Sequence, residues 1–226
     1  MTGLLPLPAL TTADVLRAMA TDPERLGART GRLVMLAAGA LEQARELAHP
    51  AVALARHPVV RCHGDVVRLG GGRSLRGAGV AAALAGAEEV AAVALTIGPA
   101  LEARVRACQA ATPALALALD AAGSALVQAL ATQAREELRA EAADRGLATG
   151  TPIGPGAPGW PVVPGQRELL ALLDPWPAGL QLLESGMLVP AKALTFLVGL
   201  GRELAPGAEP CTACDHRPRC RMRVAG

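Results

Sequence analysis

Aromatic residues are almost absent from this chain of 226 residues, which contains no tyrosine, one phenylalanine and two tryptophans. A hydrophobic core therefore has to be aliphatic, and hydrophobic residues make up 51% of the chain. Charged residues are also sparse, at 19%, with a net charge of +2. This composition is too apolar for a disordered chain, and the net charge is too small to indicate a nucleic-acid or membrane surface. We expect a folded protein that binds neither.

Features of secreted, membrane and hydrolytic proteins are missing as well. The N-terminus lacks the basic region and cleavage site of a secretory signal. The most apolar long window, residues 113–131, is interrupted by Asp120, Ser124 and Gln128, which argues against a membrane span. Five cysteines, an odd number, fit a reducing compartment better than a disulfide framework. We expect a cytoplasmic protein, and no hydrolase or Walker-type signature occurs in it.

Hydrophobic periodicity and turn residues predict helices and scattered short strands without a repeating βαβ pattern. The predicted class is α+β with a mixed or antiparallel sheet. Residues 1–205 should form one domain whose first 57 residues are helical, and residues 206–226 a cysteine-rich tail. Helices are expected over residues 14–20, 23–48, 78–85, 100–110, 113–145 and 166–173, and strands over 59–62, 65–69, 90–97, 180–183 and 193–200.

One long stretch is unsuited to a helix. From Gly150 to Gly165 the chain contains five glycines and five prolines, and we expect no regular helix there, because proline removes amide donors and glycine adds backbone entropy. Loops of this length in compact domains are usually either disordered or ligand-binding. This one has no charge and includes Ile153 and Trp160, which favours an ordered binding loop.

Three cysteines near the C-terminus, Cys211, Cys214 and Cys220, give the clearest chemical signal. Two cysteines two residues apart present two thiolates to one metal ion, and a third nearby completes most of a site. Zinc would need a fourth ligand, and His216 is close enough in sequence to serve. An iron–sulfur cluster would need another cysteine or would leave one iron open. We expect a metal here and slightly favour the cluster.

The remaining polar candidates are weaker. Glu184 follows an apolar run and precedes a Ser-Gly pair, so its carboxylate could pair with a cationic ligand or simply be an exposed turn residue. His49, His57 and His63 have no second histidine or carboxylate at ligand spacing. They are expected to be structural or solvated.

Four short motifs occur in order along the chain: Leu-Thr-Ile-Gly-Pro, Asp-Ala-Ala-Gly-Ser, Ala-Pro-Gly-Trp-Pro, and Leu-Glu-Ser-Gly-Met-Leu-Val-Pro-Ala-Lys. They occupy residues 95–99, 120–124, 157–161 and 183–192. In type, order and spacing they resemble segments of the activation domain of cobalamin-dependent methionine synthase. The resemblance extends over about residues 59–201 and is to stand-alone relatives of that domain, some of which also end in a cysteine cluster.

The resemblance implies an α+β fold with a curved, mainly antiparallel sheet, flanking helices and one long central helix. It also implies an accessory protein that presents S-adenosylmethionine to a corrinoid on a partner protein or methyltransferase and supports reductive remethylation, with an electron from a flavodoxin- or ferredoxin-like donor. Such a protein is part of a methyltransferase system and not a complete enzyme. The implied cofactor-binding residues are Ala157, Pro158, Gly159, Trp160, Glu184 and Ser185.

Three positions depart from the family pattern. Pro155 replaces an arginine suited to the carboxylate of the cofactor, Trp160 replaces a tyrosine, and Gln128 stands where a glutamate is expected. Loss of the arginine removes a charge-assisted contact worth about 1.5–3 kcal/mol, or roughly tenfold to a hundredfold in affinity. The alternative hypothesis is therefore a non-catalytic binding module with a structural metal tail, which no longer binds S-adenosylmethionine.

Overall fold

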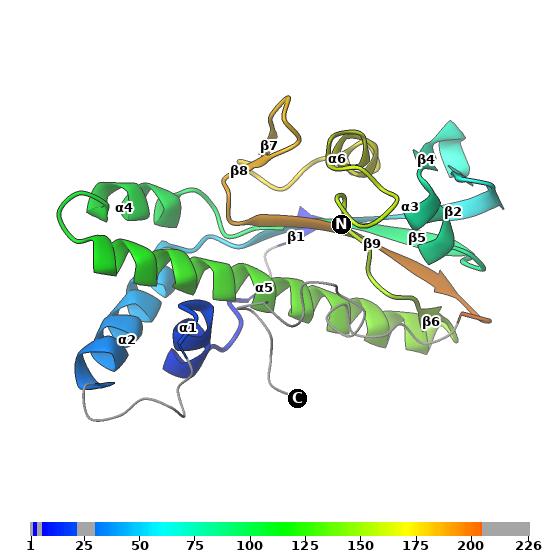
Figure 1. Ribbon diagram of the computed structural model, residues 1–226. Coiled ribbons are helices and arrows are strands. Elements are labelled where there is room, and N and C mark those ends of the chain that lie inside the picture. Colours follow the sequence, from blue (N-terminus) through cyan, green and yellow to red (C-terminus); the bar gives the residue numbers. More distant parts are fainter. Residues whose placement is uncertain (1, 4–5, 22–29, 205–226) are drawn as a thin grey trace.

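The chain folds into a curled antiparallel sheet with helices on both faces (Figure 1). The structure is a computed structural model that describes residues 2–3, 6–21 and 30–204. In chain order the elements are β1 (Thr2–Gly3), α1 (Thr12–Ala18), α2 (Thr30–Leu47), β2 (Ala51–His63), β3 (Val66–Leu69), η2 (Gly70–Gly72), β4 (Ser74–Arg76), α3 (Ala78–Ala83), β5 (Glu89–Thr96), α4 (Ala100–Cys108), α5 (Pro113–Asp144), β6 (Ala148–Thr149), α6 (Val162–Leu170), β7 (Gln181–Leu182), β8 (Leu188–Val189) and β9 (Ala193–Gly201). The α+β class, the curled antiparallel sheet and the long helix are confirmed.

The main sheet has the strand order β4-β3-β2-β5-β9-β6, with β1 beside β2, and all its pairings are antiparallel. Strand β5 lies in the middle, and its residues from Val90 to Thr96 are fully buried. Because both faces of β5 are covered, its sequence is an uninterrupted apolar run with no polar alternation. A separate short hairpin, β7–β8, lies outside this sheet.

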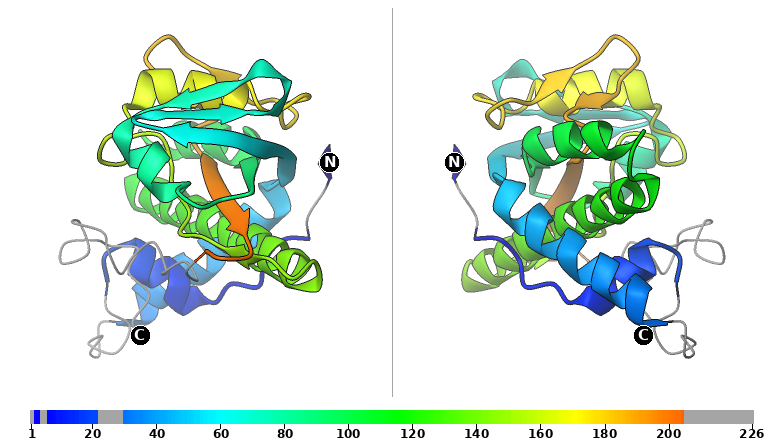
Figure 2. Two further views of the ribbon diagram at one scale, coloured as in Figure 1. Left: turned by 90° about the vertical axis from the view of Figure 1, so that its right-hand side faces the viewer. Right: turned by 90° about the vertical axis from the view of Figure 1, so that its left-hand side faces the viewer.

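The two faces of the sheet carry separate cores. On one face Ala91, Val93 and Leu95 pack with α1, α2, α4 and α5. On the other face Val90 and Ala92 pack with α3, α6 and Trp160. Figure 2 shows the same layering from the two ends of the molecule, with α5 and α2 on one side of the strands and α6 on the other.

Helix α5 is the longest element, with 32 residues from Pro113 to Asp144. It begins where expected, after Thr112 and with proline at the first helical position, where the missing amide costs no hydrogen bond. It is long and apolar enough to cross a membrane, but 61% of its apolar window is buried inside the protein. Leu138 and Ala142 keep one face buried even in its charged second half. The helix therefore serves as the core helix of this fold.

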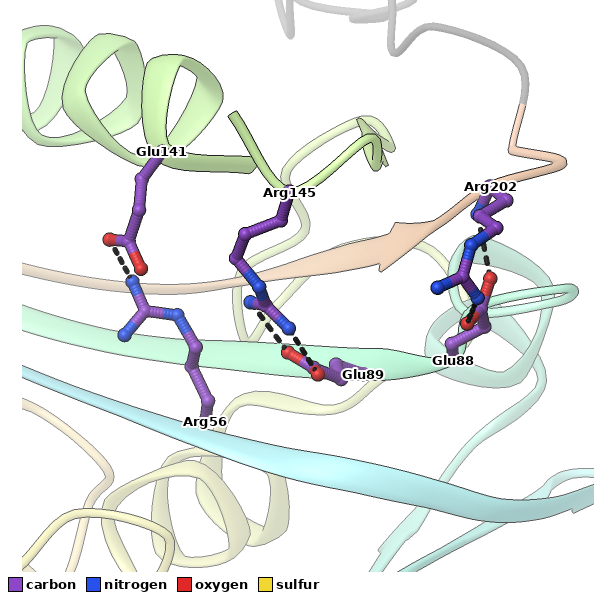
Figure 3. Close-up of polar contacts among 6 residues, drawn as sticks. All are labelled: Arg56, Glu88, Glu89, Glu141, Arg145 and Arg202. Atoms are coloured by element: carbon purple, nitrogen blue, oxygen red, sulfur yellow. Dashed lines mark hydrogen bonds and ion pairs between the residues drawn. The ribbon is translucent and has the colours of Figure 1, made fainter. Parts of the chain in front are cut away.

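Three ion pairs fasten the end of α5 and the sheet margin (Figure 3). Arg145 holds Glu89 of β5 with two hydrogen bonds, of 3.0 and 2.5 Å. Arg56 of β2 pairs with Glu141 of α5, and Arg202 pairs with Glu88 at 2.7 Å. The hydrogen bonds from Arg145 hold the pKa of Glu89 below its usual value. The pair thus favours the ionised carboxylate and helps to keep α5 on the strands.

The N-terminal part is less helical than expected. Thr11 caps α1 through a reciprocal pair of hydrogen bonds with Asp14. Strand β2, however, begins at Ala51, whereas a helical part was expected to continue to residue 57. After Pro50 ends α2, residues 51–58 pair with β5 over their whole length. Pairing with β5 therefore determines that this segment is a strand.

Two further segments differ from the expectations. The helix expected over residues 78–85 begins at Ala78 as α3, but the three residues from Ser74 to Arg76, for which no strand was expected, form β4 and pair with β3 after the glycine turn of η2. Helix α6 begins at Val162, inside the stretch expected to lack helix. Pro164 falls in the first turn of α6, where an amide would have no helical acceptor, so the proline is tolerated there.

Candidate functional site

The Pro/Gly loop forms a compact structure of its own between β6 and α6. The amide of Gly156 donates to the carbonyl of Trp160 at 2.8 Å, and the amide of Trp160 donates to Ala157 at 2.9 Å. Ile153 exchanges two hydrogen bonds with Leu197 of β9, at 3.0 and 2.8 Å, which fastens the start of the loop to the main sheet. The loop has the defined path that its uncharged composition predicts.

The loop packs directly on the backbone of α3. The amide of Gly79 donates to the carbonyl of Gly159 at 3.1 Å. A Cβ atom at Gly79 would lie 2.0 Å from the carbonyl oxygen of Pro158, and one at Gly77 would lie 2.4 Å from that of Gly159. Gly77 also has a φ of +150°, which side-chain-bearing residues rarely adopt. Only glycine at both positions lets the two backbones approach this closely.

Trp160 points into the core. Its side chain is fully buried, and its Nε1 donates to the carboxylate of Glu168 at 3.3 Å. The same Glu168 oxygen accepts the backbone amide of Arg76 at 3.0 Å, so one carboxylate joins α6, β4 and the loop. The indole face is therefore covered in this structure. Of the four predicted loop residues, Pro158 and Gly159 are exposed and Ala157 is half-buried.

Glu184 and Ser185 lie at the tip of the β7–β8 hairpin, and both are exposed. The turn is closed by the amide of Leu183, which donates to the carbonyl of Met187 at 2.9 Å. The hydroxyl of Ser185 accepts a weak bond from the amide of Met187 at 3.4 Å. The carboxylate of Glu184 forms no ion pair with any described residue, and it is free to meet a cation from solvent.

The start of α6 lies between the loop and the hairpin. A Cβ atom at Gly156 of the loop would lie 3.0 Å from Val162 Cγ2, and one at Gly186 of the hairpin 3.1 Å from Val162 Cγ1. Both predicted segments therefore contact the same side chain, although more than 20 residues separate them. Val162 is 42% exposed, and the hairpin contributes exposed Leu183, Met187 and Val189 beside it. We call this surface, centred on Val162 and bordered by the loop and the hairpin tip, the α6 surface.

The remaining motif residues come together at the start of β9, on the side of α5. Lys192 Nζ lies 2.8 Å from both Ser124 Oγ and Asp120 Oδ1 on α5. The carbonyl of Lys192 accepts hydrogen bonds from the hydroxyl of Thr96 at 3.1 Å and from the amide of Ile97 at 3.2 Å. Three of the four motifs thus form one junction that joins β5, α5 and β9, which gives them a structural role. The sequence pattern contained these residues without revealing that they touch.

Two surface hollows lie away from the α6 surface. One, of about 430 Å³, separates the segment before α1 from α5. It is lined by Asp14, Arg17, Gln128, Gln133 and Glu136 among others, so Gln128 faces this hollow and not the Pro/Gly loop. The second, of about 410 Å³, lies on strands β2, β3 and β4.

The predicted metal ligands Cys211, Cys214 and Cys220, together with His216, lie outside the described residues. Within residues 2–3, 6–21 and 30–204 no group of three metal-binding side chains comes together. Of the two cysteines in that part, Cys62 is exposed and Cys108 is buried. Metal binding by the tail stays a prediction.

Comparison with known proteins gives a match in structure alone. No family model and no curated protein matches the sequence. Among solved structures, the crystal structure of the MetH reactivation domain bound to AdoHcy is similar, with a TM-score of 0.67 and 14% sequence identity. The match covers 91% of this chain and 80% of that one. At this identity the match shows a common fold, which is the fold that the four motifs predicted.

Proposed function

We propose that this protein is an accessory factor that presents S-adenosylmethionine to a corrinoid held by a separate protein, and so supports reductive remethylation of that corrinoid. The observation that carries the proposal is the common fold with a reactivation domain crystallised with AdoHcy, over 91% of this chain. AdoHcy is what remains of S-adenosylmethionine after methyl transfer. The ordered motifs add support that is independent of the structural match.

The α6 surface is the proposed place of binding. S-adenosylmethionine carries an ammonium group and a sulfonium cation, and the unpaired Glu184 offers a carboxylate to either. Pro158 and Gly159 are exposed at the other border, where the loop could pack against an adenine or ribose. An open surface suits a methyl donor whose acceptor is a large cofactor on another protein, because the methyl group has to stay reachable.

The proposed reaction needs one electron and one methyl group. A flavodoxin- or ferredoxin-like donor would supply the electron to the corrinoid on the partner protein, and the C-terminal cysteines could hold a cluster that passes it on. The methyl group would then be transferred from the sulfonium to the reduced corrinoid, with AdoHcy as the leaving group. The part of this chain is to bind and orient the sulfonium. We place this system in the cytoplasm.

Pro155 makes the binding testable. The family arginine is replaced by a half-buried proline that packs near Gly165. Titration calorimetry of the wild type with S-adenosylmethionine and with AdoHcy should show weak binding, and P155R should tighten it about tenfold to a hundredfold. E184Q should weaken the binding of S-adenosylmethionine both in the wild type and in P155R. No heat from either protein at millimolar ligand would refute the cofactor role.

The burial of Trp160 favours the alternative, a binding module without a cofactor. The Trp160 indole is part of the core and cannot stack on a ligand at the α6 surface in this structure. In that case P155R would not raise the affinity for S-adenosylmethionine.

Anaerobic purification separates the two hypotheses for the C-terminal tail. Iron and acid-labile sulfide near stoichiometry support an electron-transferring cluster, whereas a colourless zinc protein supports a structural tail.

A further inference from the structure

The face of β2, β3 and β4 that α5 leaves uncovered is strongly basic. The register places Arg61 of β2 opposite Arg68 of β3, and Arg68 opposite Ser74 of β4. The next row along the same face is His63, Val66 and Arg76. All three arginines and the histidine are exposed. We call these six residues the basic face.

The opposite face of the same strands carries the row between the two basic rows, which consists of Cys62, Val67 and Leu75. Cys62 at the edge of this row is exposed. Val67 and Leu75 are fully buried in the core that contains Trp160. Because side chains alternate along a strand, the basic face and the α6 surface lie on different sides of this part of the sheet.

The charges of the basic face are uncompensated within the described part of the chain. Elsewhere arginines have carboxylate partners, for example Arg106 with Glu102 at 2.8 Å and Arg202 with Glu88 at 2.7 Å. Among described residues no ion pair involves Arg61, Arg68 or Arg76, and this includes the exposed Asp65 in the neighbouring turn.

Like charges directly opposite each other on paired strands are destabilising. The fold therefore places Arg61 against Arg68 at a cost to its stability. A bound anion would remove that cost.

The basic face is also hollowed. Its six residues line a depression of about 410 Å³, which falls within the range of small-molecule sites. It is too small a surface for a stable protein interface, which needs about 20–30 residues from each partner. Arginine forks match the oxygens of phosphate groups, and Ser74 adds a hydroxyl donor.

We propose that the basic face is a second ligand site, for a small phosphate-bearing anion with at least two negative charges. The site is independent of the proposed function at the α6 surface. The ligand could be inorganic pyrophosphate or the phosphate chain of a nucleotide, and both offer the same oxygens to the arginines. Binding would also be sensed at Trp160, because Glu168 bridges the amide of Arg76 and the indole nitrogen.

The test is titration calorimetry of the full-length protein at low salt with pyrophosphate, ATP and adenosine. We expect saturable binding of pyrophosphate and ATP and none of adenosine. R61Q or R68Q should weaken binding about tenfold to a hundredfold, since each removes a charge-assisted contact. R68K keeps the charge but loses the paired N–H donors of the guanidinium, so its affinity should lie between those of the wild type and R68Q.

The matched control is R106Q, which removes an arginine that is likewise exposed, from α4, and leaves the basic face intact. If R106Q and R68Q weakened the affinity for the phosphate compounds equally, the proposal would be overturned, because the anions would then be attracted only by the net charge of the protein. Absence of saturation with both phosphate compounds would overturn it too. Tighter binding of ATP than of pyrophosphate identifies an organic phosphate, and equal binding identifies the phosphate group alone.

Discussion

The contact between the Pro/Gly loop and α3 can be tested by adding one methyl group. In Gly79→Ala the new Cβ would lie 2.0 Å from the carbonyl oxygen of Pro158 and 3.2 Å from the carbonyl carbon of Gly159. Neither atom belongs to a flexible side chain, so the loop backbone itself has to move. We expect the loop to be displaced from α3 and the cover over Trp160 to open.

The expected loss of stability follows from two opposing terms. Forcing an extra carbon into a packed site costs about 1–3 kcal/mol. Replacing a helical glycine by alanine returns up to about 1 kcal/mol. The net loss is therefore about 0–2 kcal/mol, which lowers the Tm of a domain of this size by up to roughly 8 °C.

Tryptophan fluorescence gives a local measurement beside the thermal one. The chain has two tryptophans and no tyrosine, so Trp176→Phe leaves Trp160 as the single reporter. In that background Gly79→Ala should shift the emission to longer wavelength, because the buried indole gains water. The contact described here would be refuted by unchanged emission together with a raised Tm.

The control is Gly39→Ala in the middle of α2, where an added Cβ would have no atom within 4 Å. Alanine there contributes only its preference for the helix, so the free energy of unfolding should rise by about 0.5–1 kcal/mol. Its emission should stay unchanged. Opposite signs of the two Tm shifts, for the same chemical change, would identify the cause as contact with the loop.

Three further outcomes follow from the charged residues. Arg145→Gln should lower the midpoint of urea unfolding at pH 7. The difference should begin to shrink near pH 4.5 and vanish once the pH has fallen through the lowered pKa of Glu89 in the folded protein, because the pair stabilises the fold only while this carboxylate is ionised. Lys192→Met should cost about 1 kcal/mol in the same assay, since it removes both bonds to α5. Arg68→Thr should raise stability by about 0.5 kcal/mol in dilute buffer and less at high salt, because it relieves repulsion by Arg61.

The elements that the sequence predicted well have strong local patterns. Helix α5 begins at Pro113 as expected, and β5 was expected at residues 90–97 and extends from Glu89 to Thr96. The short strands β1, β4 and β6 were missed because two or three residues carry no periodicity. Their strand character depends on a neighbour in space, and only the folded chain supplies it.

The candidate site was predicted in its residue types and missed in its geometry. Composition indicated an ordered loop, and the loop is indeed closed by its own hydrogen bonds. The inward orientation of Trp160 could not be predicted, because it depends on Gly77 and Gly79, which lie some 80 residues earlier in the chain. The position of Val162 between loop and hairpin likewise requires contacts that no local pattern encodes.

The approach of the Pro/Gly loop to Gly77 and Gly79 has a consequence for evolution in this fold. Glycine at positions 159, 77 and 79 is required by contact between two backbones, whether or not a ligand is bound. Selection on folding alone would then preserve the Pro-Gly-aromatic signature, whether or not the protein binds a methyl donor. The signature is therefore a marker of this architecture, and binding of a cofactor has to be judged from the residues around it, beginning with position 155.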